Sequence, residues 1–194
     1  MDKFVLKFGG SNLKRRSDLS RILEVVRMYN KPLVVVVSAL NGVTNSLINA
    51  VKNIKTLDVD DFLSHLYSTY CDFFGEESDL LKERVYQIRN MLVGAQLIGE
   101  VPDFVHDYVV SHGERCSSLL VTHYFNKMGL NFEEALPERF GLVTDGKFNG
   151  ASVDLITSEK NLKEYFKEEK NYVVPGFYGM YENKVTILGR GGSD

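Results

Sequence analysis

The chain has 194 residues, of which 44% are hydrophobic and 25% are charged, and its formal net charge is −3. This length suits a domain with its own core, and the acidic balance argues against a protein that coats nucleic acid. No apolar run approaches the ~18 residues that cross a bilayer, no signal peptide is visible, and two cysteines are too few for a disulfide framework. We therefore expect a cytoplasmic protein that binds neither nucleic acid nor a membrane.

The first part of the chain predicts two strands separated by a helix. Residues 4–6 form a short apolar run that ends at Gly9-Gly10, and the helix that follows has Ser17-Asp18 as its expected N-cap. Residues 33–37 are uninterrupted aliphatic residues, which is typical of a central parallel strand covered on both faces. A turn at Asn41-Gly42 leads into another helix, for which Asn45 is a candidate cap.

The middle of the chain is predicted to be helical. From residue 58 to about residue 99, apolar residues recur every three or four positions, which predicts a helical hairpin broken near Gly75. Pro102 opens a further helix, which Gly113 interrupts and which ends at Gly129. We therefore expect a helical insert at about residues 58–110, whose apolar stripes serve core or inter-subunit packing.

Strand signals return in the last third of the chain. Residues 130–136 and 142–143 are strand-like, residues 155–166 predict a polar-faced helix, residues 172–174 predict a buried strand, and residues 181–188 predict a hairpin. The alternation of strands and helices predicts an α/β fold, layered as α/β/α with a mainly parallel central sheet.

Several glycines fall directly after strand-like segments. In an open α/β sheet, ligands bind at the carboxyl ends of the strands, where glycine allows backbone N–H groups to approach an anion. The segment Lys7–Ser11 therefore predicts a phosphate cradle in which a lysine balances phosphoryl charge. It matches neither a Walker A loop nor Gly-x-Gly-x-x-Gly.

Three further segments could complete such a site. Residues 38–45 follow the strongest strand signal, and their hydroxyls and helix N-terminus could hold a carboxylate or a phosphate. Within Ser111–Glu114, the carboxylate could grip a substrate ammonium if the other loops converge on it. Gly189–Asp194 places an arginine between glycines, which suits bidentate recognition of a carboxylate. Each segment alone could equally be an ordinary turn or helix cap. The four histidines show no metal-ligand spacing, so we predict no metal-binding side chains.

Taken in order, these segments resemble the aspartate kinase family of the amino-acid kinase fold. The family pattern opens with Lys-Phe-Gly-Gly-Ser/Thr, matched by Lys7–Ser11, and continues with Val-Val-Ser-Ala-x-x-Gly-x-Thr-Asn, matched by Val36–Asn45. Ser-x-Gly-Glu is matched by Ser111–Glu114, Pro-Gly-Phe by Pro175–Phe177, and Leu-Gly-Arg-Gly-Gly-Ser-Asp by Leu188–Asp194. Because the motifs keep the family order along the whole chain, the resemblance is specific.

The resemblance implies an enzyme that uses ATP and Mg²⁺ to phosphorylate the β-carboxylate of L-aspartate, the first step toward lysine, threonine and methionine. Lys7 would be a catalytic residue that stabilises the transferring phosphoryl group, and Asp194 would orient the lysine or the substrate amine. The ATP phosphates would be bound by Lys7, Phe8, Gly9, Gly10 and Ser11. Aspartate would be bound by Thr44, Glu114, Arg190, Gly191, Gly192 and Ser193, with Glu114 on the α-ammonium and Arg190 on a carboxylate.

The family pattern continues past the Ser-Asp pair into a nucleotide-binding lobe and, usually, regulatory ACT domains. By this resemblance, residues 1–194 form an amino-terminal substrate-binding lobe of an incomplete kinase domain, and the lobe alone is expected to be inactive. The full-length protein is expected to be a homo-oligomer. Two alternatives stay open: a non-catalytic module that binds a small amino acid, and another small-molecule kinase of the same fold.

Overall fold

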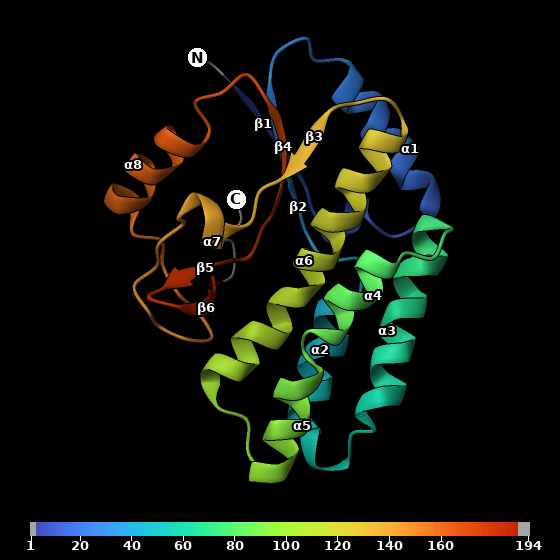
Figure 1. The fold of residues 1–194 in the computed structure, drawn as a ribbon, viewed down its shortest axis with the longest axis vertical. Coiled ribbons are helices and arrows are strands. Elements are labelled where there is room, and N and C mark those ends of the chain that lie inside the picture. Colours follow the sequence, from blue (N-terminus) through green and yellow to red (C-terminus); the bar gives the residue numbers. More distant parts are fainter. Residues whose placement is uncertain (1–2, 190–194) are drawn as a thin grey trace.

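A computed structural model describes residues 3–189, and its strands form two separate sheets (Figure 1). The strands are β1 (Phe4–Phe8), β2 (Leu33–Val37), β3 (Phe132–Glu134), β4 (Asn171–Pro175), β5 (Tyr178–Tyr181) and β6 (Lys184–Ile187). The larger sheet has the order β1-β2-β4-β3, and each neighbouring pair is parallel. The smaller sheet is the antiparallel hairpin β5-β6, which turns at Glu182-Asn183. The predicted hairpin at residues 181–188 contains this turn and the second strand, but the first strand begins earlier, at Tyr178.

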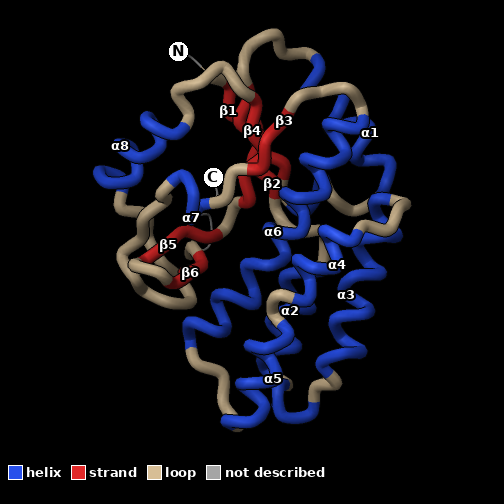
Figure 2. The backbone as a smooth tube through the Cα atoms, viewed as in Figure 1, coloured by secondary structure: helices blue, strands red, loops and turns tan. Residues whose placement is uncertain are grey.

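Helices surround the larger sheet and extend well beyond it. They are α1 (Arg16–Arg27), α2 (Val43–Lys52), α3 (Val59–Phe74), α4 (Asp79–Tyr86), α5 (Arg89–Ile98), α6 (Asp103–Lys127), α7 (Pro137–Phe140) and α8 (Leu155–Tyr165). Figure 2 shows α2, α3 and α5 gathered at one end of the molecule, with α6 running from that end to the sheet. The long helix therefore connects the helical part to the strands.

Both faces of the larger sheet carry helices, because its central strands β2 and β4 are apolar on both sides. Along β2, alternate residues from Leu33 to Val37 are fully buried in a core shared with α1 and α6. Val34 and Val36 point to the opposite face, where they meet a smaller cluster from α7 and α8. This arrangement confirms the predicted layered α/β/α fold with a mainly parallel central sheet.

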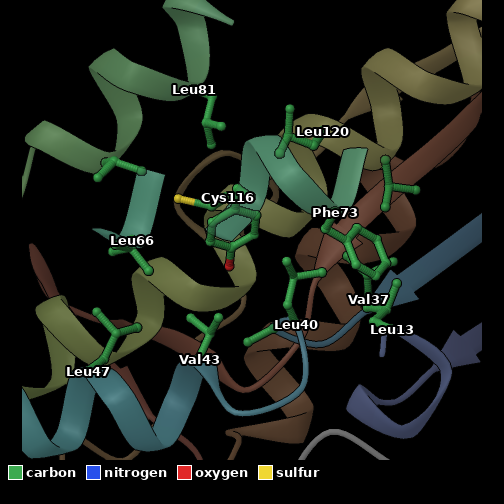
Figure 3. Packing of buried hydrophobic residues seen from close by; sticks show 14 of the residues in the cluster. Leu13, Val37, Leu40, Val43, Leu47, Leu66, Phe73, Leu81, Cys116 and Leu120 are labelled. Atoms are coloured by element: carbon green, nitrogen blue, oxygen red, sulfur yellow. The ribbon is translucent and has the colours of Figure 1, made fainter. Parts of the chain in front are cut away.

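The predicted helical insert spans α3, α4, α5 and the first turns of α6. The first helix ends at Gly75, whose φ of 75° is the left-handed conformation that glycine adopts easily. The second arm of the predicted hairpin is two helices rather than one, because the chain breaks between Tyr86 and Arg89. Figure 3 shows Leu66 and Leu81 of the insert packed beside Cys116 of α6. The apolar stripes of the insert therefore belong to the main core.

Three local predictions were wrong. Helix α1 begins at Arg16, and Asp18 lies inside its first turn, where its carboxylate accepts hydrogen bonds from the amides of Lys14 and Arg15 at 3.0 and 2.9 Å. Helix α2 begins at Val43, directly after Gly42 with φ 89°, so Asn45 is not its cap. Residues 142–143 contribute only an isolated bridge between Val143 and Met180 instead of a strand.

Candidate active site

The carboxyl ends of three parallel strands meet at one edge of the larger sheet. Phe8 of β1 is in register with Val37 of β2, which is in register with Pro175 of β4. The Ser38 amide donates to the Phe8 carbonyl at 3.1 Å, and the Gly176 amide donates to the Val37 carbonyl at 2.9 Å. The predicted loops therefore leave the sheet side by side, at the edge where open α/β folds bind ligands.

The first two loops are packed against each other. The Asn41 amide donates to the Leu13 carbonyl at 3.0 Å, and Figure 3 shows Leu13 and Leu40 close to the end of β2. Gly10 opens a 3₁₀ turn, and a Cβ added to it would lie 3.4 Å from the Ala39 carbonyl oxygen. A small residue at position 10 thus lets the two backbones approach closely.

Lys7 lies on β1 immediately before this turn, and its side chain is exposed. Strand geometry places it on the same face of the sheet as Val5, opposite to the buried Phe8. Val5 borders an apolar cavity of about 650 Å³ that extends to Gly176 and Phe177 at the same edge. The lysine is therefore placed beside an open recess rather than in the core.

The structure corrects the interpretation of Ser111–Glu114 as an interrupted segment. These residues lie in the middle of the continuous helix α6, and all are buried. A Cβ added to Gly113 would lie only 2.7 Å from the Ala39 Cβ and 3.5 Å from Val43 Cγ1. Glycine is needed here for close packing of α6 on the loop after β2, and it does not break the helix.

This close approach brings Glu114 to the edge of the sheet. The side chain is buried, the Ala39 amide donates to its carboxylate, and its Oε2 atom has no hydrogen-bond partner within the described residues. Burial raises the pKa of Glu114 to about 8. A buried carboxylate oxygen without a donor is costly, and a ligand ammonium would satisfy it.

Thr44 lies in the first turn of α2, beside the contact of Gly113 with Ala39 and Val43. The residue is half-buried, and its neighbour Val43 packs against Gly113. Because the first amides of a helix have no partner within the helix, this end of α2 favours an anionic group. Thr44 and Glu114 are thus supplied by two helices that touch.

The predicted segment Gly189–Asp194 starts at the same edge of the larger sheet, near the carboxyl end of β4. The Leu188 amide donates to the Phe177 carbonyl at 2.7 Å, and the Gly189 amide donates to the Ala151 carbonyl at 3.2 Å. The chain that leads to the arginine motif is therefore fixed next to the end of β4. The predicted site residues Arg190, Gly191, Gly192, Ser193 and Asp194 lie outside the described residues.

Sequence reasoning missed Tyr70, which supports this site from α3. Its hydroxyl donates to the Gly113 carbonyl at 2.6 Å, and the side chain is completely buried. Burial raises the pKa of Tyr70 well above its usual range, so the phenol remains a donor. An aromatic residue at helical spacing gives no indication of such a contact, because the two residues are 43 positions apart.

Two arginine–carboxylate pairs on the other side of α6 were also missed. Arg84 binds Glu134 through two hydrogen bonds of 3.1 and 3.0 Å, and both side chains are largely buried. Arg115 binds Glu138 at 2.7 Å and lies over the ring of Tyr178, 4.5 Å from its centroid. These pairs connect α6 to α4, β3 and α7. Because their charges are already paired, they brace the fold and do not form part of the site.

His112 is buried in α6 and packs against Tyr108 of the same helix. Its Nδ1 atom bonds to the Tyr108 carbonyl at 2.8 Å, and its ring packs on the Tyr108 ring. Burial, with Arg115 nearby, lowers the pKa of His112 to about 3, so the ring is neutral. The bond to a carbonyl then requires the proton on Nδ1.

Within residues 3–189, no helix is long and apolar enough to cross a membrane. The same part of the chain holds no group of three or more His, Cys, Asp or Glu side chains that could bind a metal ion.

The chain is an open α/β domain with a candidate site at the carboxyl ends of β1, β2 and β4. Its glycine loops can approach a phosphate closely, and its buried Glu114 carboxylate can pair with an ammonium. The chain belongs to the amino acid kinase family, whose model matches residues 2–194. It is 31% identical to aspartokinase 3, chloroplastic, of Arabidopsis thaliana over 98% of this chain and 37% of that protein. It is 28% identical to the aspartate kinase of Pseudomonas putida over 100% of this chain and 38% of that protein.

Solved structures have the same fold. The structure of E. coli aspartokinase III in complex with aspartate and ADP superimposes with a TM-score of 0.81 at 23% identity, over 99% of this chain and 44% of that one. The complex of the same enzyme with lysine and aspartate gives a TM-score of 0.79 at 24% identity, over 97% of this chain and 44% of that one. The chain thus spans less than half the length of these relatives.

Proposed function

We propose that residues 1–194 form the substrate-binding lobe of an aspartate kinase, which transfers a phosphoryl group from ATP to the β-carboxylate of L-aspartate. The observation that carries this proposal is Glu114, a buried carboxylate with an unpartnered oxygen next to the glycine loops. The names of the curated relatives support the choice of aspartate within the family. In the longer protein that we propose, the nucleotide-binding lobe would be formed by sequence that those relatives have in addition to the part matched here.

In this proposal, two helices and two loops each bind a different part of the substrate. Glu114 receives the α-ammonium, because an ammonium donates to its unpartnered oxygen and stabilises the ionised form that burial otherwise disfavours. Thr44 and the first amides of α2 orient the substrate from the adjacent side. Arg190 holds a carboxylate, and Gly191, Gly192 and Ser193 contribute loop contacts beside it, with Asp194 orienting the lysine or the amine.

The phosphate end of the site is assigned to the turn after β1. Phe8, Gly9, Gly10 and Ser11 bring the backbone close to the ATP phosphates, and Lys7 supplies a compact positive charge for the transferring group. Mg²⁺ would enter with ATP and neutralise phosphate charge, since residues 3–189 hold no metal-binding cluster.

Catalysis then rests on positioning and electrostatics, as is usual for phosphoryl transfer. The reaction forms a bond between a β-carboxylate oxygen and the γ-phosphorus and breaks the bond between that phosphorus and the bridging oxygen of ADP. No covalent intermediate with the protein is needed. Lys7 stabilises the charge on the phosphoryl oxygens by its position beside them.

The test is a turnover assay in the longer chain that this proposal implies, with aspartyl phosphate trapped as its hydroxamate. We expect turnover with aspartate and little with glutamate, and we expect no turnover by residues 1–194 alone. Lys7→Ala should abolish turnover, whereas Lys14→Ala, at an exposed lysine just beyond the turn, should leave it unchanged. Full activity of the Lys7→Ala protein would refute the assignment of the lysine. Binding of aspartate without turnover would instead favour a sensor module.

A further inference from the structure

Asp107 is a fully buried carboxylate that neither the motifs nor the proposed function account for. It lies on α6, and the amide of Ile187 donates to its Oδ2 atom at 2.9 Å. The amide of Asn149 donates to both carboxylate oxygens, at 3.2 and 3.0 Å. His106 Nδ1 lies 3.0 Å from Oδ1. One side chain therefore holds two backbone segments that are 38 residues apart in the chain.

The local backbone explains why a carboxylate is needed at this position. Residues 151 and 188 form a parallel bridge, with the Ala151 amide bonded to the Ile187 carbonyl at 2.8 Å. The pairing stops at Asn149, whose φ of 63° turns its backbone away from a strand conformation. The amides of Asn149 and Ile187 then both point toward Asp107, and a carboxylate can accept hydrogen bonds from both. Asp107 thus substitutes for the backbone acceptor that a continued strand would provide.

The position of Asp107 on α6 relates it to the substrate site. Glu114 follows seven residues later, which is close to two helical turns, so both side chains lie on one side of α6 about 10 Å apart. Ile187 ends β6 and is followed by Leu188 and Gly189, the described residues that lead to Arg190. The same rigid helix therefore carries the carboxylate for the ammonium and the anchor for the strand before the arginine.

We propose that Asp107 is a positioning residue that holds the end of β6 at a fixed distance from Glu114, so that the ammonium-binding and carboxylate-binding groups fit one amino acid. The inference rests on the proposed function for the identity of that amino acid. It does not make Asp107 a catalytic residue, because its carboxylate is fully occupied by protein donors. Its effect is on the affinity for aspartate and not on the affinity for ATP.

The experiment compares Asp107→Asn with Asp103→Asn in the longer chain. Asp103 lies one turn earlier on α6, is exposed, and accepts a hydrogen bond from the Asn149 side chain at 3.0 Å, so it is a matched control on the same loop. We expect Asp107→Asn to raise KM for aspartate at least tenfold and to change KM for ATP less than twofold. Asp103→Asn should change neither. An unchanged KM for aspartate, or an equal rise in both KM values, would overturn the inference.

Asp107→Glu provides a second test in case the asparagine protein does not fold. It retains both acceptor oxygens but displaces them by one methylene, so KM for aspartate should rise at least threefold. No change in KM for aspartate in this variant would count against the positioning role.

Amide hydrogen exchange separates this inference from the proposed function. Asp107→Asn should speed exchange at least tenfold at Ile187 and Asn149 and should also speed it at Gly189, whereas Asp103→Asn should not. This result does not depend on which substrate the protein phosphorylates. If the wild-type protein fails to phosphorylate aspartate, the proposed function is wrong. Unchanged exchange at these amides in Asp107→Asn would independently show that Asp107 does not hold the end of β6.

Discussion

Gly113 of α6 packs directly on Ala39, the second residue after β2, so closely that a Cβ on the glycine would lie 2.7 Å from the alanine Cβ. The same loop residue donates its amide to the Glu114 carboxylate, and its carbonyl limits the space at Gly10. Ala39 therefore lies where three of the predicted motifs meet.

Gly113→Ala should destabilise the protein by about 1–3 kcal/mol, because overpacking forces the helix and the loop apart. Urea unfolding measures this loss. Ala39→Gly in the same chain should recover most of it by removing the opposing methyl group. As a control, Gly94 lies within α5 with open space around it, so Gly94→Ala should be neutral or stabilising by up to about 1 kcal/mol. Equal losses at positions 94 and 113 would show that the contact with Ala39 is unimportant.

The stability of the protein should fall as pH rises from about 6.5 to 8, because below about pH 6.5 the buried neutral His112 ring contributes an opposite dependence that offsets the one from Glu114. Glu114 keeps its proton up to a pKa of about 8 in the folded protein, whereas the unfolded chain releases it near 4.5. Between these values the folded state binds more protons, so the free energy of unfolding decreases with pH. Each unit of pKa difference corresponds to about 1.4 kcal/mol, and the full effect should be several kcal/mol.

Glu114→Gln should remove this dependence, since glutamine does not ionise. Urea titrations at pH 5, 6.5 and 8 would show the variant gaining stability relative to wild type as pH increases. Glu24→Gln, at an exposed position of α1, should follow the wild-type curve. Parallel curves for wild type and Glu114→Gln would mean that folding does not raise the pKa of Glu114.

Loss of Arg84 should be far more damaging than loss of Arg89. Among residues 3–189, Arg84→Met leaves the largely buried Glu134 carboxylate with the Ser118 hydroxyl, at 2.6 Å, as its one side-chain donor. We expect a loss of about 3–5 kcal/mol. Arg89 makes a similar bidentate pair with Asp60, but both side chains are exposed, so Arg89→Met should cost less than about 1 kcal/mol. Denaturant unfolding midpoints at pH 8 measure the stability lost in each variant. Similar losses for Arg84→Met and Arg89→Met would contradict the argument that burial makes the Arg84–Glu134 pair more important for stability.

Much of the fold could be predicted because its signals are local. The aliphatic run at residues 33–37 and the glycines after the strands indicated the parallel sheet and the edge where its loops meet, without any long-range information. Gly113 was misinterpreted as a break because sequence patterns treat glycine as a weak helix residue, whereas here tertiary packing requires it. Tyr70 and Asp107 could not be assigned, since their partners are backbone groups 43 and 80 residues away.

The most direct test of the account is proton release when aspartate binds, measured by isothermal titration calorimetry in buffers of different ionisation enthalpy. With a pKa of about 8, Glu114 is mostly protonated at pH 7 and must ionise to pair with an ammonium. We predict the release of about 0.9 proton per aspartate bound at pH 7 and almost none at pH 9, where the carboxylate is already charged. Binding at pH 7 without proton release, or release that persists in Glu114→Gln, would contradict the central role of this carboxylate.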